Sequence, residues 1–284
     1  MPELPEVETI VRYLDKNICG KKVTDVLVLS KKQFPQDSKL VIGAKILSVS
    51  RRGKNTIISL SNGKTMIVHL RMTGQLILMD GNKEKYETGK VIPLSGGSEL
   101  PARSTRVIIS LNGGKLFFNE SRKFGAIRVV SNAEADKEAD KLGPEPFGKD
   151  FSIDYLTRIF KKTAKPIKAL LLDQEKIAGI GNIYASEILF EAKINPKRPA
   201  KGLNRKEIIA LYCATLSILK EAIKYGGSSA SDEAYIQPDT SRGLYQDYAR
   251  VYQRDGQLCR KCKALIKRVV IGGRGTFYCP NCQK

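Results

Sequence analysis

The chain has 284 residues, 42% hydrophobic and 27% charged, which indicates a globular protein large enough for two domains and excludes a disordered one. Its 49 Lys and Arg against 29 Asp and Glu give a formal charge of +20, so we expect a polyanionic partner, with nucleic acid favoured over an anionic membrane surface. No stretch approaches the ~18 apolar residues of a membrane-spanning helix, and no signal pattern opens the chain, so a cytoplasmic location is expected.

The first predicted element is a helix from Pro5 to Ile18, because apolar residues recur there at helical spacing. Residues 23–130 then contain short runs rich in Val, Ile and Leu separated by turn residues, which is typical of strands. Asn62-Gly63 and Asn112-Gly113-Gly114 are strong hairpin signals. The pattern predicts an antiparallel sandwich or barrel, with a loop or insertion over residues 81–106.

The second half of the chain changes to helical periodicity after a charged segment. Residues 132–150 contain Gly-Pro-Glu-Pro-Phe-Gly and are predicted to be an interdomain linker. Ser152 suits the N-cap of one helix, and Asn204 with Glu207 forms a capping-box pattern ahead of another. Residues 226–256 are polar and rich in Gly, Ser and Asp, so we expect a long loop there.

The cysteines near the C-terminus have the spacing of a metal site. Two Cys-x-x-Cys pairs, 16 residues apart, can each place two thiolates on one tight turn. The four residues are Cys259, Cys262, Cys279 and Cys282. Four thiolates leave no open coordination position, so one structural Zn²⁺ is predicted, and two disulfides are disfavoured in a cytosolic protein. The intervening residues indicate a hairpin that exposes Lys267 and Arg274, while Cys19 and Cys213 are expected to pack in the interior.

Three carboxylates stand at and before the start of the first helix. They are Glu3, Glu6 and Glu8. Acidic residues stabilise helix N-termini through the helix dipole, so a purely structural role stays open. On a helical wheel Glu6 falls on the apolar side, whereas Glu8 points away, which indicates that Glu6 is not a solvated surface charge.

Pro2 is a candidate nucleophile. Removal of Met1 would leave Pro2 with a secondary amine, and an α-amino group of pKa about 8 is partly unprotonated near neutral pH. Such an amine forms an iminium with the aldehyde carbon of a sugar. A covalent nucleophile flanked by carboxylates is a workable acid–base site.

Several motifs together resemble formamidopyrimidine-DNA glycosylase of the bacterial type. They are, in chain order, MPELPEVET, RRGKN, HLRMTG, ESRKFGA, GIGNIYASE and the closing CxxC…GGRGTFYCPNCQK. The resemblance implies an α+β multidomain fold. A leading helix and an antiparallel β-sandwich would occupy residues 1–131, followed by a linker at 132–150. A helix–two-turn–helix domain with the lesion loop would occupy 151–245, and a zinc finger 246–284. It implies base-excision repair of double-stranded DNA containing an oxidised purine (8-oxoguanine or formamidopyrimidine), followed by β,δ-elimination at the abasic site.

The resemblance also implies roles for individual residues. Pro2 would form the iminium, Glu3 would be its acid–base partner, Glu6 would brace the site, and Lys54 would reach the lesion phosphate. Further DNA contacts would come from His69 and Arg71. Met72, Arg122 and Phe124 would be the three intercalating residues. Asn182 and Arg274 would bind the flanking phosphates. From periodicity alone, Phe124 would equally fit a core aromatic residue, and His69 would fit a sheet residue.

The chain departs from the family pattern at two places. Its loop at 226–246 is longer and more acidic, and the segment from Arg103 to Arg106 lacks a histidine that members often have there.

Leu4 favours the purine-specific branch over the endonuclease VIII branch. The alternatives are the same scaffold acting on oxidised pyrimidines and a non-catalytic zinc-ribbon DNA-binding protein. A monomer is expected.

Overall fold

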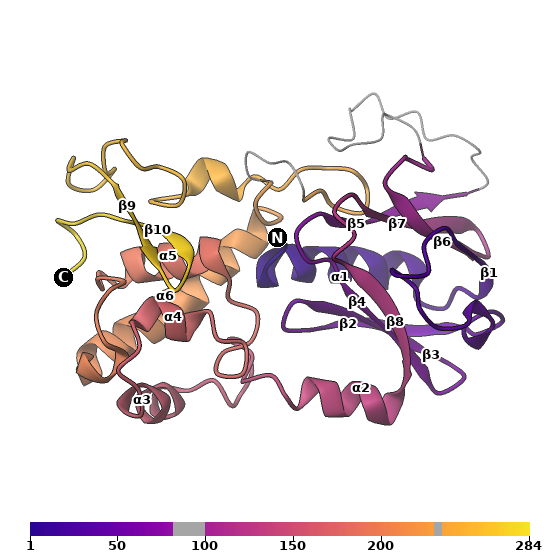
Figure 1. Ribbon diagram of the computed structural model, residues 1–284, viewed down its shortest axis with the longest axis horizontal. Coiled ribbons are helices and arrows are strands. Elements are labelled where there is room, and N and C mark those ends of the chain that lie inside the picture. Colours follow the sequence, from indigo (N-terminus) through magenta and orange to yellow (C-terminus); the bar gives the residue numbers. More distant parts are fainter. Residues whose placement is uncertain (82–99, 230–234) are drawn as a thin grey trace. The chain divides into compact units, whose positions relative to one another are not determined.

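The computed structural model describes residues 1–81, 100–229 and 235–284, which form two compact units (Figure 1). Unit 1 comprises Met1–Asp140 and Tyr225–Gln246, and unit 2 comprises Lys141–Lys224 and Asp247–Lys284. The expected boundaries differ from this division: residues 132–140 of the expected linker fall in unit 1, and residues 247–284 of the expected zinc finger fall in unit 2 with the helices. The sequence grouped residues 225–245 with the helices, whereas their contacts group them with the strands of unit 1.

Unit 1 has a leading helix, α1 (Leu4–Ile18), and two antiparallel sheets that confirm the predicted sandwich (Figure 1). The strands of the first sheet are, in spatial order, β1 (Val23–Val28), β6 (Thr105–Leu111), β7 (Gly114–Glu120) and β5 (Gly74–Asp80). Those of the second are β2 (Ile46–Arg52), β3 (Asn55–Leu60), β4 (Lys64–His69) and β8 (Ala126–Ser131). The remaining elements are η1 (Ser38–Leu40) and α2 (Asn132–Ala139).

One hydrophobic core joins α1 to both sheets. Val7, Ile10, Leu14 and Ile18 are fully buried, so the face of α1 that packs inward is the one its periodicity predicts. Burial of each such side chain stabilises the fold by about 1.5–3 kcal/mol. The packing of α1 on β2 and β3 fixes the position of the residues just ahead of the helix, including Glu3.

Two connections cross from one sheet to the other at the same end of unit 1. Residues 70–73 join β4 of the second sheet to β5 of the first, and residues 121–125 join β7 of the first to β8 of the second. The strands that carry these connections are paired, His69 opposite Ala126 and Gly74 opposite Glu120. The register therefore brings the two crossing loops, far apart in sequence, next to each other.

The segment after residue 225 belongs to unit 1 because both of its described ends bond to that unit. The Ser228 N–H donates to the Glu6 carboxylate at 2.8 Å, and the Leu78 N–H of β5 donates to the Pro238 carbonyl at 2.9 Å. Ile236 also packs with Ile77 and Phe117 on the outer face of the first sheet. The loop expected at 81–106 falls mainly on residues 82–99, outside the described residues, and β6 begins at Thr105.

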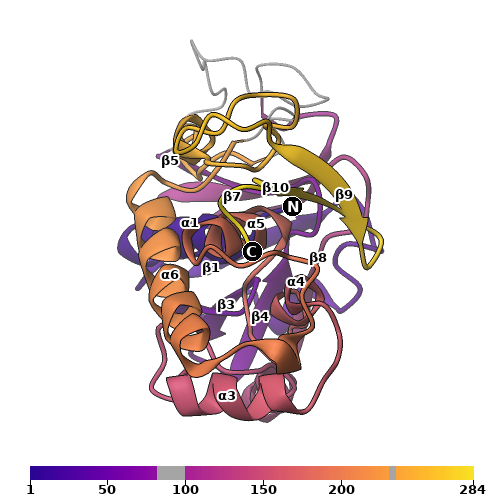
Figure 2. The same cartoon turned by 90° about the vertical axis from the view of Figure 1, so that its left-hand side faces the viewer.

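Unit 2 is helical and ends in a two-stranded hairpin (Figure 2). Its elements are α3 (Ile153–Lys161), α4 (Ile167–Leu171), α5 (Asn182–Glu191), η2 (Ala200–Gly202), α6 (Arg205–Lys224), η3 (Tyr245–Tyr248, which begins in unit 1), β9 (Lys267–Ile271) and β10 (Arg274–Tyr278). Both predicted caps are present, since the Tyr155 N–H donates to the Ser152 hydroxyl and the Glu207 N–H donates to the Asn204 side chain. None of the helices in the described part of the chain combines the length and apolar character of a membrane span.

The terminal hairpin is fastened to the helices by a second core and by a buried carboxylate. Phe190 of α5 packs with Val251, Ile266 and Phe277. The fully buried Glu187 carboxylate accepts the backbone N–H groups of residues 250–252 at 2.8–2.9 Å. Burial raises the pKa of Glu187, although these hydrogen bonds oppose the shift. The expected burial of Cys19 and Cys213 is wrong, because both residues are exposed.

Candidate active site and nucleic-acid interface

The N-terminal residues form a buried polar cluster. Pro2 is buried, Glu3 is 2% exposed and Glu6 is 1% exposed. One oxygen of Glu6 accepts the Glu3 N–H at 2.7 Å as half of a capping box, and the other accepts the Ser228 N–H at 2.8 Å. A Cβ at Gly227 would lie 2.7 Å from the Glu6 carboxylate, so only glycine allows this approach. Glu6 thus joins α1 to residues 227–228 by hydrogen bonds, and its burial agrees with its position on the apolar side of the helix.

Lys54 lies on the turn between β2 and β3 and is only 8% exposed, unlike an ordinary turn lysine. The Arg51 guanidinium, 2.8 Å from the Glu8 carboxylate, also donates to the Gly53 carbonyl at 3.2 Å. Burial opposes ionisation of Glu8, but hydrogen bonds from Arg51 and Arg12 hold its pKa below the ordinary value. Glu8, which points away from the apolar face of α1, therefore supports the turn that carries Lys54.

His69 is a neutral imidazole at physiological pH. Burial lowers its pKa to about 4, and the nearby cations Arg71 and Lys54 add to the effect. Its Nδ1 accepts the backbone N–H of Arg71 at 3.0 Å, so the proton of the neutral ring is on Nε2. The residue can donate one hydrogen bond to an anion without carrying charge, and its low pKa makes it a poor general base.

The two crossing loops carry the predicted intercalating residues. Met72 is half-buried, Arg122 is exposed and Phe124 is 57% exposed. The Arg122 guanidinium lies over the Phe124 ring, with Cζ 5.3 Å from the ring centre. The core-aromatic interpretation of Phe124 is therefore wrong, because the residue lies on the loop between β7 and β8 and its side chain is exposed.

A basic hollow of about 500 Å³, which the sequence did not indicate, lies beside the second crossing loop. Its lining residues are Arg103, Ser104, Arg106, Ser121 and Lys123. The Arg106 guanidinium is held by the backbone carbonyls of Glu120 and Arg103, and within the described residues none of the three cations forms an ion pair with a carboxylate. The three cations therefore have no carboxylate partner in the described part of the chain, which suits an anion. The only sequence signal was the pair of arginines standing where a histidine is common.

In unit 2 the chain fold brings Asn182 and the terminal hairpin together. Asn182 is the first residue of α5, and its side-chain amide donates to the Gly275 carbonyl at 3.0 Å. Arg274, the neighbour of Gly275, begins β10 and is exposed. The N-terminus of α5 thus lies beside the strand residue that follows the exposed Arg274, an arrangement that favours a phosphate.

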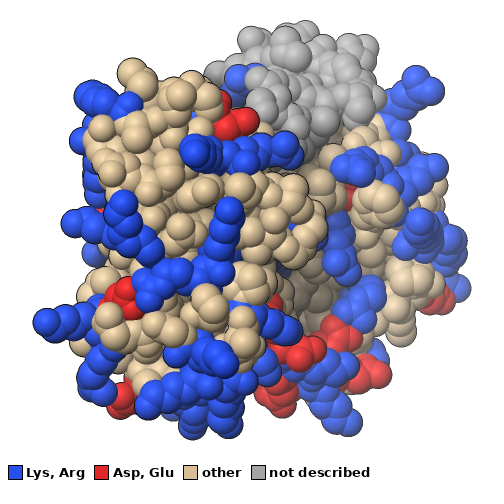
Figure 3. Space-filling model, turned by 60° about the vertical axis from the view of Figure 1, so that its left-hand side comes forward, with Lys and Arg blue, Asp and Glu red and all other residues tan. Residues whose placement is uncertain are grey.

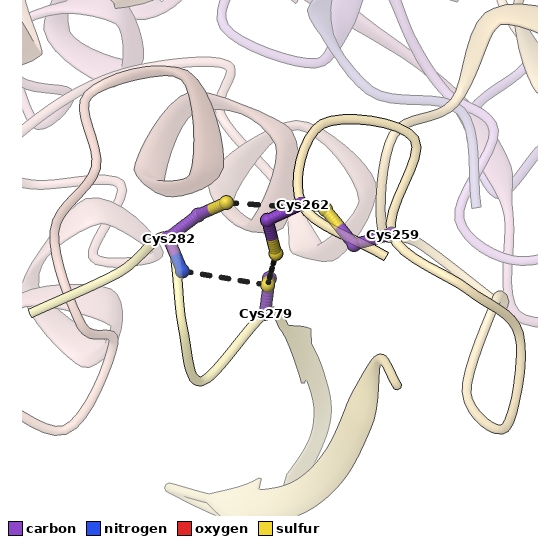
Figure 4. A group of neighbouring side chains, drawn as sticks. All are labelled: Cys259, Cys262, Cys279 and Cys282. Atoms are coloured by element: carbon purple, nitrogen blue, oxygen red, sulfur yellow. Dashed lines mark hydrogen bonds between the residues drawn. The ribbon is translucent and has the colours of Figure 1, made fainter. Parts of the chain in front are cut away.

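The four predicted cysteines converge on one point from two loops (Figure 4). Their sulfur atoms all lie within 4.8 Å of one another, and Cys262 and Cys279 are 3.4 Å apart. Sulfurs around a tetrahedral zinc with bonds of about 2.3 Å would be about 3.8 Å apart, so the set fits that ion. Burial and the neighbouring sulfurs raise the pKa of Cys282 to about 12, and a bound cation would oppose this shift by stabilising the thiolate. The cysteines form the site of one structural zinc ion.

Basic side chains are more prominent than acidic ones on the molecular face in view in Figure 3. Lys and Arg outnumber Asp and Glu on the face shown in Figure 3, in keeping with the formal charge of +20. Long-range attraction of a polyanion is the physical consequence.

Family models match nearly the whole chain. Residues 1–127 match the formamidopyrimidine-DNA glycosylase N-terminal domain, residues 142–234 match its H2TH domain, and residues 256–284 match a zinc finger found in FPG and IleRS. The formamidopyrimidine-DNA glycosylase of Pelotomaculum thermopropionicum is 40% identical, with 100% of this chain and 99% of that protein covered. The chain belongs to the formamidopyrimidine-DNA glycosylase family.

Solved structures of formamidopyrimidine-DNA glycosylases have the same fold. The Thermus thermophilus enzyme is 38% identical, with 99% of this chain and 98% of that chain covered and a TM-score of 0.86. A Lactococcus lactis mutant in complex with DNA containing Fapy-dG is 32% identical, with full coverage of both chains and a TM-score of 0.87. The wild-type Lactococcus lactis enzyme, solved with DNA containing an oxidised pyrimidine, is 33% identical, with full coverage of both chains and a TM-score of 0.85.

Proposed function

We propose that the chain excises oxidised purines, 8-oxoguanine and formamidopyrimidines, from duplex DNA and then cleaves the abasic site. The observation that carries this proposal is the N-terminal cluster, in which Pro2 is buried beside Glu3 and Glu6. The hydrogen bonds of Glu6 account for its burial within the fold, whereas a Pro2 buried beside the Glu3 carboxylate suits an amine nucleophile with an acid–base partner. Membership of the glycosylase family supports the same conclusion.

The chemistry begins with the free amine of Pro2, after removal of Met1. The Pro2 nitrogen attacks C1′ of the damaged nucleotide, the bond from C1′ to the base breaks, and the base leaves with a proton. Glu3 donates a proton to the ring oxygen as the sugar opens, which leaves an iminium between Pro2 and C1′. Loss of a C2′ proton then expels the 3′-phosphate, a second elimination expels the 5′-phosphate, and hydrolysis returns the amine.

The base leaves the helix before it is excised, and the hole must be filled. Met72, Arg122 and Phe124 stand on the adjacent crossing loops with Phe124 exposed, which suits insertion into the base stack. Arg122 has donors for the unpaired partner base. We call these three side chains the wedge.

The backbone contacts position the DNA and read no sequence. Lys54, His69 and Arg71 of unit 1 are assigned to phosphates at the lesion, and Asn182 with Arg274 of unit 2 to flanking ones. The basic hollow beside Lys123 is assigned to one more phosphate. We assign the lesion loop to residues 226–246, which lie in the chain between the helices that end at Lys224 and the zinc finger, and whose contacts are with unit 1. The enzyme is assigned to act as a cytoplasmic monomer on the nucleoid.

Borohydride trapping tests the proposal directly. The protein is incubated with an 8-oxoguanine:cytosine duplex and sodium borohydride, which reduces an enzyme–DNA iminium to a stable adduct. Wild-type protein that lacks Met1 should form the adduct, and Pro2→Gly should lose most of it. An adduct on an oxidised-pyrimidine duplex alone would favour the other substrate class. No adduct on either duplex would leave only DNA binding.

A further inference from the structure

Glu120 is a fully buried carboxylate at the end of β7, directly ahead of the second crossing loop. One oxygen accepts the Arg122 N–H at 2.9 Å and the hydroxyl of Thr73. The other oxygen accepts the Gly125 N–H at 2.7 Å. The side chain therefore bonds to both crossing loops, beside Met72 on one and on either side of Phe124 on the other.

The surroundings show that these bonds hold the carboxylate in place. Among the described residues no cation forms an ion pair with the Glu120 carboxylate, so its charge is balanced by the hydrogen bonds that the loops donate. A Cβ at Gly125 would lie 2.7 Å from the Glu120 carboxylate, so glycine is required for this close approach. If either loop moved away, a buried charge would lose a donor.

The backbone of Glu120 also forms hydrogen bonds with two residues that line the basic hollow. Its N–H donates to the Ser104 carbonyl at 2.8 Å, and its carbonyl accepts from the Arg106 guanidinium at 2.9 Å. On the far side of the second loop, the buried Gln33 side chain donates to the carbonyl of Lys123, whose φ of 57° lies in the left-handed region. A non-glycine residue in that region costs energy and persists only where its surroundings impose it.

We propose that Glu120 is a positioning residue that holds Met72, Arg122 and Phe124 as one preformed wedge, an inference that rests on the proposed function. Without the carboxylate, the two loops would have to be ordered during each encounter with a lesion. That ordering entropy would then reduce the rate of base extrusion. Binding to undamaged duplex, which depends on phosphate contacts, would change little.

Glu120→Gln tests this inference with little change of shape. Its amide keeps one acceptor but turns an NH₂ group toward a loop donor, so at least one hydrogen bond is lost. Single-turnover excision from an 8-oxoguanine duplex should slow roughly 10- to 100-fold, the loss expected for one or two hydrogen bonds to a charged group. Elimination on a single-stranded abasic oligonucleotide, which has no base stack to fill, should stay within about twofold of wild type.

Thr73→Val is the second variant, because it removes only the hydroxyl donor and leaves the Glu120 charge in place. We expect a smaller loss on the same duplex. Glu134→Gln is the matched control, since Glu134 also accepts a backbone N–H but caps α2 away from the crossing loops. A 2-aminopurine next to the lesion reports wedge insertion by its fluorescence. The fluorescence rise should be slowed in Glu120→Gln and Thr73→Val and unchanged in Glu134→Gln.

The outcomes separate the inference from the proposed function. Wild-type rates of excision and fluorescence in both Glu120→Gln and Thr73→Val would overturn the positioning role. Equal losses on duplex and single-stranded substrates would also overturn it, because they indicate general destabilisation. Absence of cleavage by the wild-type protein would refute the proposed function, while the fluorescence step would still test the wedge. If Glu120→Gln does not fold, the Thr73→Val result decides.

Discussion

The Arg122 guanidinium lies 5.3 Å from the centre of the Phe124 ring, and both side chains are exposed at the end of the sandwich. Such a cation–π contact at an exposed site stabilises the pair by about 0.5–1 kcal/mol. The contact holds the two side chains against each other at the surface where we propose that they enter the base stack.

Phe124→Ala should slow excision more than it weakens non-specific binding. Stacking of a base on an aromatic ring contributes about 1–3 kcal/mol, so excision should fall roughly 10- to 100-fold. Thermal unfolding should change little, because an exposed ring contributes little to the core. Single-turnover excision and binding to undamaged duplex measure the two effects. Equal losses in both assays, together with a lower melting temperature, would return the ring to a core role.

The pH dependence of stability should contain a contribution from His69, the only histidine in the chain. Its pKa is about 4 in the folded protein and about 6.5 in the unfolded chain, so the unfolded state binds more protons between these values. Stability should therefore fall as the pH falls from about 6.5 to 4, by roughly 3 kcal/mol at most. Denaturant unfolding at several pH values should show a shallower slope for His69→Gln, and an unchanged slope would contradict the low pKa.

Glu8→Gln should reduce activity without touching the chemistry. The substitution weakens the ion pair with Arg51, which also donates to the carbonyl before Lys54, so the lysine becomes less well placed. A partly exposed pair of this kind is worth about 1 kcal/mol or less, so excision should fall several-fold. Single-turnover kinetics measure this loss. Glu134→Gln is again the control, and equal rates for the two variants would show that the turn is held by other contacts.

Removal of zinc should release the terminal hairpin from its place beside α5. A thiol-reactive reagent should free about one zinc ion per chain, as expected for a closed four-cysteine site. Binding to undamaged duplex should weaken at the same time, because Arg274 lies on that hairpin. Metal content measured on purified protein is the direct check. A chain that folds and binds DNA with no zinc would contradict the structural role.

The sequence predicted the features that depend on neighbours in the chain. The helix from Pro5 to Ile18, the caps at Ser152 and Asn204, and the hairpin around Gly272 all follow from local periodicity or local hydrogen bonding. The zinc cluster could be predicted because the two cysteines of each Cys-x-x-Cys pair are close in sequence and lie on one turn.

The contacts that the sequence did not indicate join distant residues. Glu6 and Ser228 are 222 residues apart, and Thr73 and Glu120 are 47 apart, so no periodic pattern connects them. The helical wheel showed only that Glu8 points away from the apolar side of α1, and it could not show that Arg51 of β2 meets its carboxylate. Strand order and register decide such contacts. Long-range hydrogen bonds to Glu6 and Leu78 likewise place residues 225–246 with the strands of unit 1 and not with the helices that precede them.

Arg274→Ala should weaken DNA binding roughly uniformly across sequences. Arg274 is exposed beside Gly275, whose carbonyl accepts from the Asn182 amide, and we propose that both side chains contact neighbouring phosphates. Loss of one phosphate contact should reduce the log–log salt slope of binding by about 0.9. Lys267→Ala is the matched control, since Lys267 is also exposed on the hairpin but lies at its far end, opposite Tyr278. If both variants lose affinity and salt dependence equally, the hairpin acts through its general charge; if neither does, it does not touch the DNA. A loss confined to Arg274→Ala would establish a specific phosphate contact.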